Sequence, residues 1–79
     1  MRNALIENID KLHTTEMGLE RIKRNLGITE DPVKWCRVRI MDKDASINRQ
    51  GKNWYVVIDR YVITLNASSY TIITAHREK

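Results

Sequence analysis

Hydrophobic positions in the first part of the chain recur at helical spacing. Leu5, Ile6, Ile9 and Leu12 follow Asn3, which is a favourable N-cap residue. This spacing predicts a short N-terminal helix. Because isolated helices of this length are unstable in water, the helix should depend on tertiary packing.

A second helix is expected after a break in the pattern. Thr14 or Thr15 can cap its start, Glu16 suits the positive first turn, and Gly27 can end it as a C′ residue. One face of this helix carries Leu19, Ile22 and Leu26. Both ends of this element are therefore defined by the sequence.

The segment 32–41 fits two patterns. Val33, Cys36 and Ile40 share a helical face, whereas Cys36, Val38 and Ile40 also alternate as in a strand. A start signal at Pro32 and a run of about ten residues favour the helix. On that helix Trp35 and Val38 lie opposite the core face, which indicates either a second packed layer of the chain or a partner; our hypothesis is a homodimer contact or a contact with a partner protein.

Beyond residue 51 the pattern changes to that of strands. Segments 54–59, 61–66 and 69–75 are rich in β-branched and aromatic residues, and 46–48 is a shorter candidate. The connections Asp59-Arg60 and Ala67-Ser68 contain two residues each, which predicts an antiparallel meander.

The two-residue connections also predict a register. Val56 should face Ile63, Leu65 should face Tyr70, and Ile63 should also face Ile72. One face of the sheet is then apolar: Trp54, Val56, Ile58, Ile63, Leu65, Tyr70 and Ile72. The other face is mixed: Tyr55, Val57, Val62, Thr64, Asn66, Thr71 and Ile73.

These elements predict an α+β fold in a single domain, 1–79. Two to three N-terminal helices pack on one face of a C-terminal antiparallel meander of three to four strands. The helices should cover the apolar face and leave the mixed face at least partly open.

Composition narrows the class of protein. The 79 residues carry a net charge of +4 and a single cysteine, Cys36. No apolar run is long enough to span a bilayer and no secretory signal is recognisable, so we expect a cytoplasmic protein without a membrane contact. One cysteine makes neither an internal disulfide nor a cysteine-based zinc site, and we predict no metal and no cofactor. We interpret Cys36 as a small core residue rather than a nucleophile.

Candidate chemistry lies on the mixed face of the sheet, because the sequence has no phosphate loop, paired metal ligands or serine elbow. Tyr55, Thr64 and Thr71 should project from adjacent strands, and His76 ends the last strand. The hydroxyl groups could orient a phosphodiester while His76 transfers a proton. An RNA cleaver that uses the substrate 2′-hydroxyl needs no metal.

Three cations complete this hypothetical site. Arg49 and Lys52 flank the first of the three main strands, 54–59, and Arg77 follows His76. They would bind RNA by neutralising phosphates, and such binding would be salt-sensitive. The same charges also fit an ordinary solvated surface with both signs mixed.

The sequence resembles two groups of proteins. The stretches 51–57, 61–67 and 70–76, together with 8–16 and 20–22, are similar to an uncharacterised family of short bacterial proteins, a domain of unknown function. More remotely, the C-terminal meander resembles the last strands of the barnase, EndoU, colicin and RelE superfamily of ribonuclease toxins. The first resemblance implies no activity; the second implies a helix-then-sheet fold and RNA as the substrate class.

Two functional hypotheses follow. The first is a small RNA-interacting protein of toxin-like fold that acts as a metal-independent endoribonuclease. The alternative is a non-catalytic protein-interaction module, an inhibitor or regulator, that docks a partner through its open sheet face or its Trp35 side. They differ in whether Tyr55, Thr64, Thr71 and His76 converge in one basic site.

Overall fold

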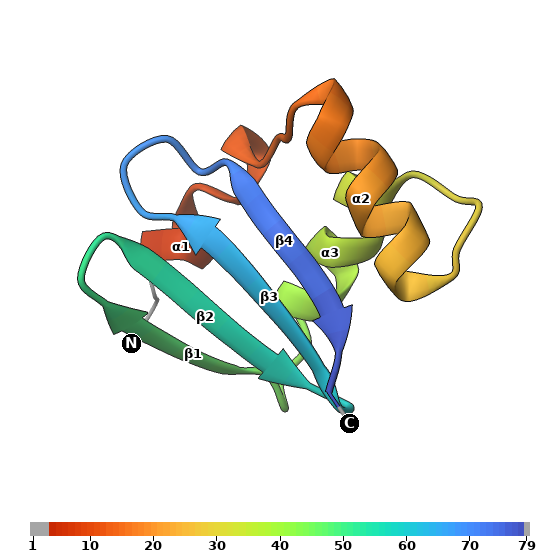
Figure 1. The fold of residues 1–79 in the computed structure, drawn as a ribbon. Helices are drawn as coiled ribbons and strands as arrows, with labels where there is room; N and C mark the ends of the chain where they lie inside the picture. Colours follow the sequence, from red (N-terminus) through yellow and green to blue (C-terminus); the bar gives the residue numbers. More distant parts are fainter. Residues whose placement is uncertain (1–3, 79) are drawn as a thin grey trace.

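Helices precede strands along the chain in the computed structural model, which describes residues 4–78 (Figure 1). The helical elements are α1 (Ala4–Glu7), the 3₁₀ helix η1 (Ile9–Lys11), α2 (Glu16–Leu26) and α3 (Pro32–Ile40). The strands are β1 (Ser46–Gln50), β2 (Asn53–Ile58), β3 (Tyr61–Asn66) and β4 (Ile72–Arg77). The predicted α+β class is confirmed.

The N-terminal segment is one α-helical turn followed by a 3₁₀ turn, not the single helix that its spacing predicts. Asn8 lies at the break, and its side-chain Nδ2 donates to the Ala4 carbonyl at 2.8 Å. An asparagine side chain that binds a backbone carbonyl in this way competes with helix continuation. The predicted cap at Asn3 lies outside the described residues.

Helix α2 begins and ends as its sequence predicts. The Thr15 hydroxyl accepts a hydrogen bond from the Gly18 N–H at 3.0 Å. Gly27 ends the helix in the left-handed region, with φ of 67°, and its N–H donates to the Lys23 carbonyl. Just before the helix, the Thr14 hydroxyl donates to the Ile72 carbonyl and ties the start of α2 to β4.

Helix α3 starts at Pro32, as the start signal predicts, but the prediction that Trp35 lies on an outer face is wrong. Trp35 is only 4% exposed, and its ring meets the Tyr61 ring edge-on at 4.9 Å. The Arg39 guanidinium covers it at 4.2 Å. Trp35 neighbours Cys36 on the helix, and its long side chain reaches β3. The buried side of α3 is therefore wider than the face formed by Val33, Cys36 and Ile40. Only Val38, 57% exposed, remains open to a partner.

The strands form one antiparallel sheet in the order β1-β2-β3-β4. The predicted register of β2 with β3 is confirmed, since Val56 pairs with Ile63. The connecting residues Asp59 and Arg60 both have positive φ, 48° and 69°. Two such residues define a type I′ turn, whose twist matches that of the flanking strands.

The predicted register of β3 with β4 is wrong. Leu65 pairs with Ile72 instead of Tyr70, and Ile63 pairs with Ala75 instead of Ile72. The Asn66 side chain explains the shift, because its Oδ1 accepts hydrogen bonds from the N–H groups of the two serines that follow, 68 and 69. The connection therefore spans residues 67–71, and a bulge follows in β4.

All helices lie on one side of the sheet, and the other side is open (Figure 1). Helices and strands share one hydrophobic cluster, in which Ile22, Cys36 and Ile40 meet Val56, Ile63 and Leu65. None of the helices that the structure describes is long and apolar enough to cross a membrane.

Candidate nucleic-acid interface

The open face of the sheet carries two of the predicted hydroxyl groups side by side. Tyr55 pairs with Thr64, and Thr64 pairs with Thr74. His76 pairs with Val62, in the adjacent row of the same face. Across the outward positions of all four strands, which the structure describes completely, none is Lys, Arg, Asp or Glu. This face therefore holds hydroxyl and amide groups without a cation.

The predicted cations do not lie on that face. Arg49 pairs with the buried Trp54, so it belongs to the helix-covered side of β1, and its Nε donates to the Gly51 carbonyl at 3.0 Å. Lys52 is exposed in the turn between β1 and β2. Arg77 pairs with Tyr61 at the other end of the sheet. The predicted binding residues are thus divided between two ends.

Three segments meet at what we call the loop end of the sheet: the β1–β2 turn, the β3–β4 connection and residues 11–13. The Lys52 carbonyl accepts from the Ala67 N–H at 2.8 Å, which joins the first two segments. The His13 carbonyl accepts from the Ile72 N–H at 2.7 Å, which adds the third. Backbone hydrogen bonds therefore hold the three segments next to one another.

Thr71 lies at the loop end, against His13 rather than beside Thr64. The His13 Nε2 is 3.0 Å from the Thr71 hydroxyl, and Nδ1 is 2.8 Å from the Lys11 carbonyl. Because a carbonyl only accepts, Nδ1 carries the proton in this arrangement, and Nε2 of the neutral ring accepts from Thr71. The Ser69 hydroxyl lies 2.7 Å from that of Thr71 and donates to the Asn66 Oδ1 at 3.2 Å.

This relay has the form of an oriented base. One ring nitrogen is held by a fixed acceptor, and the other presents its lone pair to a hydroxyl group, as in sites where histidine activates a nucleophile. His13 is exposed, so a ligand can approach its ring from solvent. The arrangement can accept a proton from a bound hydroxyl.

Cations and aromatic rings also gather at the loop end. The Lys11 Nζ lies 5.5 Å from the centre of the Tyr70 ring, and the Arg49 guanidinium lies 5.6 Å from that of Trp54. The two rings contact each other, with centroids 5.3 Å apart. With Lys52 in the adjoining turn, the loop end combines three cations with a half-buried tyrosine.

His76 lies at the opposite end of the sheet. It is exposed, and its Nδ1 is 3.4 Å from the Arg77 carbonyl. Five residues of chain separate it from Thr71, which at strand rise corresponds to about 16 Å. The structure therefore does not bring His76 together with Thr71, Arg49 and Lys52.

Cys36 has the surroundings of a core residue. Its side chain is fully buried, and burial raises the pKa of the thiol to about 12, although Arg39 partly opposes the shift. A thiol with so high a pKa is a poor nucleophile at neutral pH. The described residues also include no group of three or more His, Cys, Asp or Glu placed to hold a metal ion.

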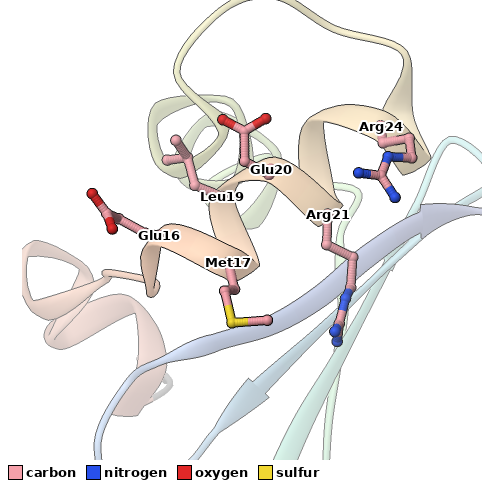
Figure 2. A pocket seen from close by; sticks show the side chains of 6 residues that line it. All are labelled: Glu16, Met17, Leu19, Glu20, Arg21 and Arg24. Atoms are coloured by element: carbon pink, nitrogen blue, oxygen red, sulfur yellow. The ribbon is translucent and has the colours of Figure 1, made fainter.

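A depression of about 500 Å³ runs along the outer side of α2 (Figure 2). Its lining consists of Glu16, Met17, Leu19, Glu20, Arg21 and Arg24, all from this one helix. It has no second wall, and its two acidic and two basic side chains balance each other. It contains none of the predicted site residues, and we do not assign it a ligand.

His13 and Lys11 are the functional candidates that reasoning from the sequence missed. His13 lies 58 positions before Thr71, and no local pattern connects the two. The signal that could have found them is the parallel bridge between His13 and Thr71, which only the folded chain shows.

Comparison with known proteins gives one match. Residues 6–76 match the model of the family described as "Protein of unknown function (DUF3781)". None of the curated proteins and none of the solved structures compared with the chain matches it, so the resemblance to ribonuclease toxins stays a prediction. Since the matched region covers nearly the whole sequence, the chain belongs to the DUF3781 family of proteins of unknown function.

Proposed function

We propose that this protein is a cytoplasmic RNA-interacting protein that binds a single strand at the loop end of its sheet. The observation that carries the proposal is the position of Lys11 over the Tyr70 ring and of Arg49 over the contacting Trp54 ring, with Lys52 in the adjoining turn. Cations neutralise phosphates, and a partly exposed aromatic ring offers a surface on which an unpaired base can stack. A buried free thiol, Cys36, is compatible with the reducing cytoplasm.

Cleavage of the bound strand is the catalytic form of this proposal, and it assigns the proton transfer to His13 instead of His76. The 2′-oxygen forms a bond to the adjacent phosphorus while the bond from phosphorus to the 5′-oxygen breaks. His13 Nε2 takes the 2′-hydroxyl proton, and the departing 5′-oxygen takes a proton from solvent. The products are a 2′,3′-cyclic phosphate and a 5′-hydroxyl, and no metal is needed.

The lone pair of His13 supports this assignment. Its Nε2 already faces a hydroxyl, that of Thr71, at 3.0 Å. A substrate 2′-hydroxyl that replaced Thr71 would meet the same lone pair, within the reach that general base catalysis requires.

A second candidate function rests on the open sheet face. Its outward positions carry no charged side chain, and Val57 and Ile73 are 38% and 40% exposed. Interfaces between proteins are depleted of charge at their centres, whereas surfaces that bind RNA need cations. This face therefore suits a protein partner better than a nucleic acid.

Binding of a fluorescent single-stranded RNA, followed by anisotropy at several salt concentrations, tests the main proposal. Lys11→Ala and Lys52→Ala should each weaken binding and reduce the salt slope by about 0.7. Arg60→Ala and Arg77→Ala, at the other end of the sheet, are the matched controls and should bind as the wild type does. Equal losses in all four variants, or no binding at low salt, would reject the loop end and leave protein docking.

A further inference from the structure

Within residues 4–78, strand β1 is an uncovered edge of the sheet. There it pairs only with β2, contains no proline, and four of its five residues are exposed. The other edge strand, β4, packs against α2 and continues into the bridge between Thr71 and His13. Among the residues that the structure describes, β1 therefore offers a row of unpaired backbone groups for pairing with another strand.

The hairpin geometry shows which backbone groups of β1 point outward. Gln50 and Asn53 close the two-residue turn between β1 and β2, and such a closing pair exchanges its hydrogen bonds. Bonded positions alternate along an antiparallel pair. Asn48 therefore turns its backbone groups toward β2, whereas Ile47 and Arg49 turn theirs toward the free edge.

Arg49, the one charged residue of β1, does not block pairing at this edge. A cation on an edge strand commonly prevents association because it cannot be buried. Here the Arg49 side chain is folded back onto its own chain, with its Nε on the Gly51 carbonyl and its guanidinium over the Trp54 ring. The edge is left open to a second strand.

Charges at the two ends of β1 have opposite signs. Asp44 precedes the strand and Lys52 follows it, and both are exposed. The Asp44 N–H donates a hydrogen bond to the side chain of the neighbouring Asp42. The carboxylate of Asp44 itself makes no such hydrogen bond within the turn. An antiparallel partner of the same sequence would place each of these charges opposite its complement.

We propose that two copies of this chain pair antiparallel through β1, around a two-fold axis at Asn48. Ile47 of each copy then exchanges backbone hydrogen bonds with Arg49 of the other, and Asp44 of each copy faces Lys52 of the other. The two sheets join into one of eight strands, with the helices of both copies on the same side.

The charges favour this register, and they favour a second copy of the chain as the partner of β1. A register centred on Arg49 would oppose two guanidinium groups, and a parallel arrangement would bring like charges together at each end. A second copy supplies the complementary charge twice, by symmetry. Pairing of five residues is smaller than a standard interface, so we expect an equilibrium that depends on concentration.

A charge exchange tests the proposal in sedimentation equilibrium without RNA. Asp44→Lys and Lys52→Glu each turn two attractive pairs of the dimer into repulsive ones, so each variant alone should dimerise about tenfold more weakly than the wild type. An equimolar mixture of the two variants should recover the wild-type affinity, because in the mixed dimer both pairs have opposite signs again. Arg60→Glu, at the far end of the sheet, is the control and should dimerise normally.

Two results would overturn the proposal. One is a wild-type protein that stays monomeric at the highest attainable concentration, which would show that β1 does not pair with a second copy. The other is a mixture that associates no more tightly than its components, which would exclude the facing of Asp44 and Lys52. Both measurements are independent of RNA, so neither depends on the proposed function. Circular dichroism of each variant checks that the fold is retained.

Discussion

The two ends of the sheet each carry a histidine, but in different surroundings. At the loop end His13 is held by the Lys11 carbonyl and the Thr71 hydroxyl, beside a pair of aromatic rings. At the opposite end, which we call the hairpin end, His76 has one long contact, with the Arg77 carbonyl. There the turn residues Asp59 and Arg60 also mix the signs of charge, whereas Lys11, Arg49 and Lys52 give the loop end one sign.

The difference shows what a histidine needs for proton transfer besides being accessible. Both rings are exposed. A proton-transfer group also has to be held at a fixed distance from the reacting hydroxyl, because orientation contributes much of the rate. Two hydrogen bonds fix the ring of His13, and no comparable pair fixes the ring of His76. We therefore expect the two histidines to respond differently to replacement.

The largest effect is expected on RNA cleavage. His13→Ala should lower the cleavage rate about 10²–10⁴-fold, the usual contribution of general acid–base catalysis, while His76→Ala keeps the wild-type rate. The assay uses single-stranded RNA with EDTA present, and a strand with 2′-deoxyribose at the scissile position should stay intact.

The converse result would restore the interpretation made from the sequence. Loss of cleavage in His76→Ala with normal activity in His13→Ala would mean that the hairpin end performs the chemistry. Absence of cleavage in the wild type would reject the catalytic form of the proposal and leave binding alone. Thermal melts of both variants separate these results from unfolding.

A substitution in the hydrophobic core should destabilise both ends of the sheet together, because the whole domain unfolds. Ile63 is fully buried in β3, between the two ends, and Ile63→Ala should lower the free energy of unfolding by about 2–5 kcal/mol. Its neighbour Val62 faces outward and is half-buried, so Val62→Ala should cost about 1 kcal/mol or less. Urea denaturation measures both, and equal costs would contradict the assignment of the two faces.

The fold was predictable wherever a local signal decided it. Thr15, Gly27 and Pro32 mark helix ends because such signals act within one turn of chain. The register of β2 with β3 follows from a two-residue turn. The register of β3 with β4 was not predictable in this way. The Asn66 side chain accepts hydrogen bonds from the two residues 68 and 69 and so lengthens the connection, but the sequence does not distinguish this connection from a shorter loop.

The candidate site was predictable in its residue types and not in its grouping. Arg49, Lys52 and Thr71 do come to one end of the sheet, but the histidine beside them is His13. Alternation along a strand says which face a residue occupies only while the strand is regular: continued from Thr71 and Ile73 it puts His76 on the apolar face, whereas the bulge in β4 places His76 on the open face. It cannot say which end of the sheet a distant segment contacts, and the bridge from His13 to Thr71 is such a contact.

The smallest effect is expected at the hairpin end. Arg60 has φ of 69°, a conformation that costs residues other than glycine about 1–2 kcal/mol. Arg60→Gly removes this cost but adds about 0.5–1 kcal/mol of chain entropy to the unfolded state. The net stabilisation should be about 0.5 kcal/mol, which for a domain of this size raises Tm by about 2–4 °C.

This last variant also separates the two ends. Glycine at position 60 keeps the type I′ turn, since Asp-Gly is a favoured pair there, and the Arg60 carbonyl that accepts from the Glu78 N–H is retained. RNA affinity should therefore stay at the wild-type level while Tm rises. A loss of RNA affinity in a more stable protein would show that the Arg60 side chain contacts the nucleic acid, and the binding surface would then have to extend to the hairpin end.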